Sequence, residues 1–294
     1  MSAAIPPTST AFTRIAGLRL AHVERGTGDP IVLLHGNPTS SFLWREVMPP
    51  LAGLGRLIAP DLIGHGGSDK LPESDGPERY TFERTYALLA EQLDALDVRQ
   101  RVTLVVHDWG SALGFHWARM NPEKVRGIAY MEAIVMPFAS WDDWPANARG
   151  IFQGFRSPKG EDLILNRNLF IESVLPNAVL RRLSDNEMAV YRAPFSTAAD
   201  RLPTLRWPRQ IPIAGEPANV VAHVQAYADW LPTSAIPKLF VNADPGSILI
   251  GRQREFCRTW AHQTEVTVPG LHFIQEDSGA AIGQAVAAWL ATLD

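Results

Sequence analysis

One aspartate stands where a nucleophile elbow would present its reactive side chain. Residues 106–110 (VHDWG) lie between a continuous apolar run and a segment with helical spacing. The usual elbow, G-x-S-x-G, is a sharp turn between a strand and a helix that exposes its central residue. Asp108 takes the central position and Gly110 keeps the small residue, whereas Val106 replaces the first glycine. The sequence thus matches the geometry of the elbow and not its complete motif, and a plain helix N-cap is the alternative role for Asp108.

A carboxylate at this position favours a different reaction from a serine. Its ordinary pKa is about 4, so it is ionised at neutral pH and attacks without a base, which a serine requires. Attack on an acyl carbon would give a labile anhydride, whereas attack on a saturated carbon with a leaving group gives a stable ester. Asp108 therefore indicates displacement at an sp³ carbon, as in an alkyl halide or an epoxide.

The ester must then be hydrolysed, which requires a base for water. His272 lies in the loop 269–273 (PGLHF), before the last helical pattern, and the nucleophile precedes it in the chain as this kind of site requires. Such a base needs an acid to orient it. Glu132 and Asp244 each follow an apolar strand, and the spacing alone leaves both open.

Two neutral donors accompany the nucleophile. Asn37 follows an early strand in the turn 35–38 (HGNP), and Trp109 comes directly after Asp108. The Asn37 amide and the Trp109 indole N–H can stabilise charge that develops on a leaving atom. A full cation would bind chloride or bromide more tightly and slow its release, so neutral donors suit a halide.

The elements that would position these residues alternate between short apolar strands and helices. This alternation is typical of a parallel sheet covered on both faces. Strands are expected at 18–24, 31–34, 56–59, 102–106, 125–131, 237–242 and 265–268, and helices at 81–96, 111–120, 218–230 and 282–293. The pattern breaks over 134–214, which is rich in Pro, Trp and Arg and has only short helical stretches. We therefore expect an α/β core, 1–133 and 215–294, with a helical cap, 134–214, over the ligand-binding crevice.

Composition excludes several classes of function. The 294 residues carry 27 basic and 31 acidic side chains, a net charge of −4 that does not suit a nucleic-acid binder. No apolar run reaches the roughly 20 residues that span a bilayer. The single cysteine, Cys257, excludes an internal disulfide and a cysteine zinc site. Residues 1–16 have no apolar signal region, so we expect a cytoplasmic protein, with a periplasmic route left open.

At these residues the chain resembles the haloalkane dehalogenases of the α/β-hydrolase superfamily. The resemblance extends from the strand before His35 to the last helix and is closest to the subfamily that includes the hexachlorocyclohexane-pathway enzymes. Its strongest marks are HGNPTSSFLWR (35–45), PDLIGHGGSDK (60–70), HDWGSALGFHWA (107–118), YMEAI (130–134), FRSPKGE (155–161), WPRQIPIAG (207–215) and HFIQED (272–277). The resemblance implies an α/β-hydrolase fold, a mostly parallel sheet flanked by helices, with the cap inserted after the sixth strand.

The resemblance also assigns roles. In that subfamily the acid follows the sixth strand, which matches Glu132 and favours it over Asp244. Asn37 and Trp109 match the halide-binding pair, and Asp108 and His272 complete the catalytic pentad. It implies a small halogenated aliphatic substrate, a chloride or bromide product, no metal, no organic cofactor, no nucleic acid or membrane partner, and a monomer or weak homo-oligomer.

Apolar side chains of the cap and its margins would surround the substrate. By resemblance, the pocket wall comprises Ile134, Trp144, Phe152, Phe170, Val174, Ala178, Trp207, Pro208 and Ile248. Core packing would explain these apolar residues almost as well. The segment 141–144 (WDDW) carries an extra residue, and Ala178 stands where a larger apolar residue is usual, so the range of substrates is left open.

Three rival functions share the fold, and the site must separate them. An epoxide hydrolase uses the same Asp–His pair but adds cap tyrosines, and only Tyr191 lies in the insertion. A coelenterazine-type luciferase, an oxygenase, retains much of the pentad. A non-catalytic binding protein on the same fold is disfavoured by an intact pentad.

Overall fold

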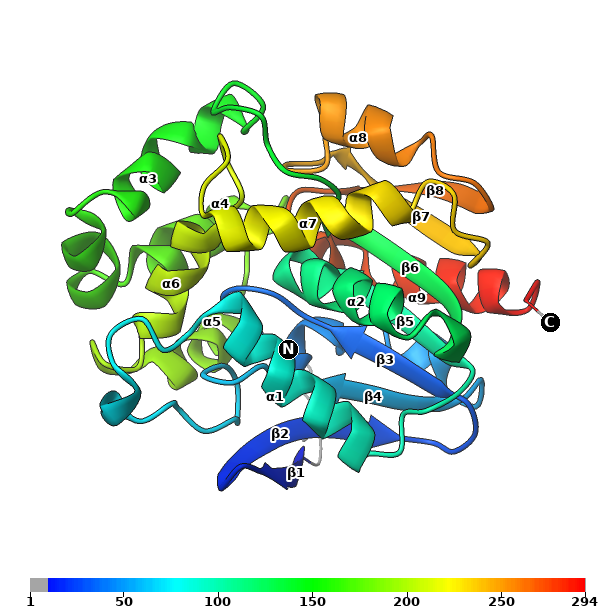
Figure 1. Ribbon diagram of the computed structural model, residues 1–294. Coiled ribbons are helices and arrows are strands. Elements are labelled where there is room, and N and C mark those ends of the chain that lie inside the picture. Colours follow the sequence, from blue (N-terminus) through cyan, green and yellow to red (C-terminus); the bar gives the residue numbers. More distant parts are fainter. Residues whose placement is uncertain (1–9, 294) are drawn as a thin grey trace.

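A computed structural model describes residues 10–293, in which eight strands form one twisted sheet (Figure 1). The strand order is β1-β2-β4-β3-β5-β6-β7-β8. β2 pairs antiparallel with β1 and β4, and every other pair is parallel. The strands are β1 Thr10–Ile15, β2 Leu18–Arg25, β3 Pro30–Leu34, β4 Arg56–Pro60, β5 Val102–His107, β6 Val125–Ala133, β7 Lys238–Pro245 and β8 Gln263–Gly270. The predicted mostly parallel sheet is confirmed.

Two hydrophobic cores lie on the two faces of this sheet. Along β5, Leu104 and Val106 belong to one core and Val105 to the other, as the two-residue repeat of a strand requires. Helices α1, α2 and α7 pack together over the first face, and α9 covers the second. The helices of the core are α1 Phe82–Ala95, α2 Asp108–Met120, α7 Ala218–Trp230 and α9 Ile274–Leu290, with the short α8 Gly251–Cys257 between β7 and β8. None of the helices within residues 10–293 has the length and hydropathy of a membrane span.

The expected elements are present, with differences at their ends. α2 begins at Asp108 and α9 at Ile274, both earlier than the apolar spacing indicated. α9 contains a break at Ser278 (φ −135°), which separates its first turn from the regular helix. β1 was not predicted, because an exposed edge strand with little apolar content leaves a weak signal. The expectation of no signal region concerns mainly residues 1–9, which lie outside the described residues.

The segment assigned to the cap is helical. Figure 1 shows α3, α4, α5 and α6 grouped at one side of the sheet. The helices are α3 Ala146–Arg156, α4 Leu175–Asn177, α5 Asp185–Arg192 and α6 Leu202–Gln210, with π-helical turns Asp162–Asn166 and Phe170–Val174. α5 starts with a capping box in which Ser184 and Glu187 satisfy each other's backbone N–H groups. The boundaries 134 and 214 of the cap stay a prediction.

Gly110 allows α2 to pack closely against β3. A Cβ atom at Gly110 would overlap the carbonyl groups of Leu34 and His35. These backbone atoms are fixed by the sheet and cannot move aside cheaply. The small residue of the elbow is therefore required by the packing that brings the start of α2 to the end of β3.

We predict that Gly110→Ala lowers the free energy of unfolding by about 1–3 kcal/mol, because the added methyl group has no space. The matched control is Gly150→Ala on α3, where a Cβ would meet nothing within 4 Å. That change should raise stability by about 0.5–1 kcal/mol through helix propensity. Urea denaturation measures both, and equal stability of the two variants would contradict this packing argument.

Candidate active site

Asp108 lies on a sharp turn between β5 and α2. Its φ of 49° is left-handed, which costs a non-glycine residue about 1–3 kcal/mol and persists only when the surroundings impose it. Two contacts do so: the Ser111 hydroxyl donates to the Asp108 carbonyl, and the Ile134 N–H donates to that hydroxyl at 2.9 Å. A side chain at Gly36 would overlap the Asp108 carboxylate, so only glycine fits opposite it. The turn thus presents the carboxylate as an elbow presents its nucleophile.

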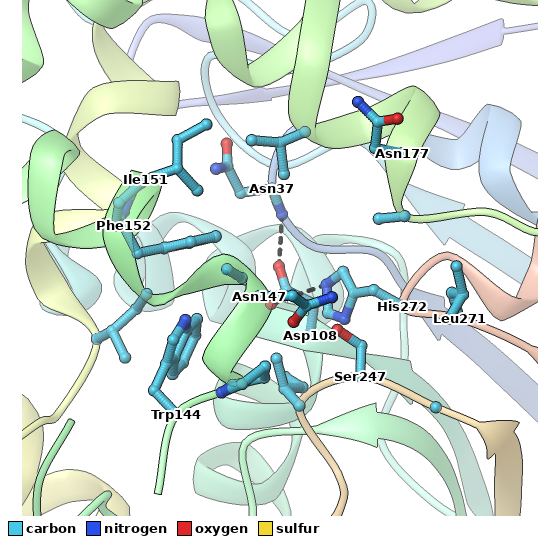
Figure 2. A pocket seen from close by; sticks show the side chains of 18 of the residues that line it. Asn37, Asp108, Trp144, Asn147, Ile151, Phe152, Asn177, Ser247, Leu271 and His272 are labelled. Atoms are coloured by element: carbon cyan, nitrogen blue, oxygen red, sulfur yellow. Dashed lines mark hydrogen bonds and ion pairs between the residues drawn. The ribbon is translucent and has the colours of Figure 1, made fainter. Parts of the chain in front are cut away.

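His272 lies between the carboxylates of Asp108 and Glu132. Figure 2 shows Asp108 beside it at the cavity. The His272 Nε2 is 3.6 Å from Oδ1 of Asp108, and its Nδ1 is 3.3 Å from Oε2 of Glu132. All three side chains are buried or nearly so. The structure therefore brings together the predicted nucleophile, base and acid in the order that the chemistry requires.

Glu132 is the carboxylate that contacts His272, and Asp244 is not. Glu132 is the penultimate residue of β6 and has a left-handed φ of 40°, which turns its side chain toward the histidine. Backbone N–H groups of Ser247 and Ile248 donate to its two oxygens at 3.1 and 2.8 Å. Asp244 is exposed near the end of β7. The geometry thus places Glu132, and not Asp244, against His272, whereas the role of Glu132 as the acid stays a prediction.

The two carboxylates decide the charge of the histidine. Burial opposes protonation of His272, but the hydrogen bonds and charges of Asp108 and Glu132 outweigh it and raise its pKa to about 9. Burial likewise opposes ionisation of Asp108, yet His272 and the backbone N–H of Trp109 hold the pKa of that carboxyl below its usual value. At neutral pH the pair is an imidazolium beside an ionised nucleophile.

Asn37 and Trp109 direct donors toward the nucleophile. The Asn37 backbone N–H donates to Oδ2 of Asp108 at 2.8 Å. The Asn37 side-chain oxygen is 3.4 Å from Nε2 of His65, which leaves its NH₂ group for the cavity. Within residues 10–293 no group accepts a hydrogen bond from that NH₂ or from the Trp109 indole. The Trp109 ring is braced by Trp207, with ring centroids 4.5 Å apart. Two neutral N–H donors are therefore available beside Asp108.

A cavity of about 580 Å³ opens above these groups. Asn37, Asp108, Trp109 and His272 line its catalytic end. The predicted wall residues that line it are Ile134, Trp144, Phe152, Phe170, Val174, Ala178, Pro208 and Ile248. Trp207 does not line it, and its placement in the wall was wrong: the side chain is fully buried behind Trp109.

Several lining residues were missed by the sequence analysis. Polar side chains come from the cap and from the loop after β7, namely Asn147, Ser173, Asn177 and Ser247, joined by the apolar Ile151, Ile211, Ile250 and Leu271. Short polar residues near helix ends and in loops give no signal that separates a cavity from solvent. The lining contains no tyrosine, and Tyr191 is buried and bonded to Glu276 instead. This arrangement disfavours the epoxide-hydrolase alternative.

His107 has a structural place in the site. It ends β5, and its Nε2–H donates to the backbone carbonyl of His272 at 2.7 Å. Burial lowers the pKa of His107 to about 3, so the ring is neutral and serves as a fixed donor. Among residues 10–293 no cluster of three or more His, Cys, Asp or Glu side chains suits a metal ion.

Comparisons with known proteins agree with this geometry. A family model for the alpha/beta hydrolase fold matches residues 29–279. A haloalkane dehalogenase of Sphingobium indicum is 60% identical over 283 residues, covering 96% of this chain and 95% of that protein. One from Mycolicibacterium smegmatis is 51% identical and covers 95% and 90%. The crystal structure of haloalkane dehalogenase DbeA from Bradyrhizobium elkani superposes with a TM-score of 0.91 at 42% identity, covering 96% and 97%.

We predict that an NMR titration of the His272 imidazole has its midpoint near pH 9, in line with its raised pKa. Asp108→Ala should lower this pKa, because it removes one of the two carboxylates that offset the effect of burial on the imidazole. Asp244→Asn is the matched control and should leave it unchanged. Because the folded pKa exceeds the ordinary 6.5, these contacts stabilise the fold below pH 6.5, and that stabilisation is lost as pH rises through about 9. The same midpoint in the wild type and in Asp108→Ala would contradict the contact between Asp108 and His272.

Proposed function

Since the chain belongs to the haloalkane dehalogenases, hydrolases that act on carbon–halide bonds, we propose that it works through a covalent ester on Asp108. The observation that carries the proposal is the Asp108 carboxylate at the catalytic end of the cavity, with His272 on one side and neutral donors on the other. A halogenated aliphatic molecule is the substrate, and an alcohol, a halide and a proton are the products.

The first step is displacement at the carbon that bears the halogen. An oxygen of Asp108 attacks that carbon from the side opposite the halogen, and the bonding pair leaves with the halide. The NH₂ group of Asn37 and the indole N–H of Trp109 hold the departing ion. Both donors are neutral and already oriented, so they stabilise the developing charge without binding the product too tightly.

The second step is hydrolysis of the ester. Esterified Asp108 is neutral and has lost its hydrogen bond to His272, so the pKa of His272 falls from about 9 and the ring can lose its proton. Neutral His272, oriented by Glu132, then takes a proton from a water that attacks the ester carbonyl. Backbone N–H groups of Asn37 and Trp109 stabilise the oxyanion, as they stabilise the free carboxylate. The oxyanion then collapses with cleavage of the bond between the carbonyl carbon and the alkyl oxygen. The departing alkoxide takes the proton of the carboxylic acid that forms, which frees the alcohol and restores the Asp108 carboxylate.

Halide release at pH 8 from 1,2-dibromoethane and 1-chlorobutane is the direct test. We predict turnover by the wild type, none by Asp108→Ala, and release of at most one halide per enzyme by His272→Ala. The last variant should stall as an ester, visible by mass spectrometry on the peptide that contains Asp108. Glu132→Gln should slow hydrolysis by about a hundred-fold or more, whereas its matched control Asp244→Asn should cost little.

Other results would redirect the assignment. Normal turnover by His272→Ala would remove it as the base. Opening of styrene oxide without halide release would keep the Asp–His pair and discard the halide site. Light from coelenterazine without either activity would favour the oxygenase alternative.

The two steps should respond differently to pH. Because the pKa of Asp108 lies below its ordinary value of 3.8, we predict a single-turnover halide burst that is flat from about pH 5 to 8. Hydrolysis needs neutral His272 and should fall as pH drops below the pKa of His272 in the ester. Rapid quenching should therefore find the ester accumulating at low pH. A burst that falls in parallel with hydrolysis would show that a protonation change at His272 also governs alkylation.

A further inference from the structure

The loop that carries His272 is only three residues long and is fixed from two sides. Residues 271–273 connect β8 to α9. His107, at the end of β5, donates to the backbone carbonyl of His272. The flanking backbone N–H groups point elsewhere: Phe273 donates to the carbonyl of Ala178 at 3.1 Å, and Leu271 donates to Oδ2 of Asp277 at 3.2 Å. One contact therefore comes from the sheet, at His107. The other two come from Ala178 of the cap and from Asp277 at the start of α9.

Asp277 joins the His272 loop to the cap. While Oδ2 accepts from Leu271, Oδ1 accepts from the backbone N–H groups of Leu180 and Arg181 at 2.8 and 3.1 Å. Asp277 ends the separate first turn of α9, and the break at Ser278 divides this turn from the regular part of the helix. The neighbouring Ala178 lines the cavity. The cap segment that follows the wall residue Ala178 and the loop of the base thus share one carboxylate.

A partly buried group of four charges next to this carboxylate joins the same elements. The fully buried Glu276 carboxylate accepts from Arg45, at 2.7 Å from its Nη1, and from Arg181 and the Tyr191 hydroxyl. Glu187 of α5 accepts from both arginines, at 2.7 Å from Arg45 and 2.6 Å from Arg181. Two positive and two negative charges leave no net charge to desolvate. The cap segment 178–192 is therefore held to the start of α9, next to the base.

We propose that Asp277 is a positioning residue for His272 and couples the orientation of the base to the cap wall of the cavity. This inference rests on the proposed two-step function. Asp277 touches neither substrate nor reacting atoms; it acts through the backbone of Leu271. Its role separates the two steps, because alkylation uses Asp108, Asn37 and Trp109, which are held by β3, β5 and α2. Hydrolysis alone needs His272 aligned with the ester and Glu132.

The variant Asp277→Asn tests this coupling. An asparagine keeps the size of the side chain but offers one acceptor oxygen and one NH₂ group, so it can serve the cap or Leu271 and not both. We expect the rate of ester hydrolysis to fall about ten- to a hundred-fold, the loss that a misaligned catalytic group causes, with the halide burst within about two-fold of wild type. The pH dependence of hydrolysis should also shift, because the environment of His272 changes. Rapid quenching and intact mass measure both steps.

Glu172→Gln is the matched control. Glu172 pairs with Arg192 within the cap, at 2.8 Å, and does not touch the His272 loop. The rates of alkylation and of ester hydrolysis in this variant should match those of the wild type. Tyr191→Phe is the second variant, used if Asp277→Asn does not fold: it removes one donor to Glu276 while its ring stays against Phe42. Its hydrolysis step should slow selectively, by less than in Asp277→Asn.

Each outcome decides the question. Selective slowing of hydrolysis with a shifted pH profile supports the coupling. Equal loss in both steps, or unchanged steps with lower thermal stability alone, overturns it and leaves Asp277 a structural residue. If the wild type forms no ester on Asp108, the proposed two-step function fails. If the wild type forms the ester and the folded variant hydrolyses it at the wild-type rate, only the coupling fails.

Discussion

Two buried carboxylates that share one imidazole are the constraint on which this site depends. An ion taken out of water costs several kcal/mol unless its hydrogen bonds are replaced. Asp108 is compensated by the N–H groups of Asn37 and Trp109, and Glu132 by those of Ser247 and Ile248. These donors lie after β3, β5 and β7, at the carboxyl ends of parallel strands. The ends of the parallel strands thus supply the N–H donors that stabilise these buried charges.

The same constraint explains the left-handed backbone at two site residues. Asp108 and Glu132 both follow the buried stretch of a parallel strand, and both have a left-handed φ, 49° and 40°. That turn swings each side chain out of the alternation of its strand and toward His272. Close packing around the turn holds it, through Gly36 opposite the Asp108 carboxylate and Gly110 against β3. Strain at functional residues is therefore balanced by glycines that have no chemical role.

Sequence reasoning located the reacting groups because each follows an apolar strand or precedes a helix. The elbow, the histidine loop and the alternation of strands and helices are local patterns, and local patterns survive in a linear chain. The choice between Glu132 and Asp244 is not local, because it depends on which strand end turns toward His272. The spacing did not decide it; the resemblance favoured Glu132, and the structure shows the contact of Glu132 with His272 and the exposure of Asp244. The placement of Trp207 in the cavity wall could not be judged for the same reason, since an aromatic ring against the core and one against a cavity look alike in sequence. The early start of α9 was hidden by the break at Ser278.

The charge distribution around the cavity is matched to a reaction that moves a negative charge without creating one. In the proposed alkylation, Asp108 loses its charge as the halide gains it, so the net charge of the site is constant. The described lining contains no Lys or Arg, and Asp108 and His272 are its only titratable groups. Arg45 and Arg181, where the cap meets the start of α9, are instead neutralised by Glu187 and Glu276. A free cation in the cavity would lower the energy of carboxylate and halide alike, which slows both attack and product release without favouring the transition state. Neutral donors at Asn37 and Trp109 avoid that cost, because they act where the charge arrives and hold it only weakly once it has formed.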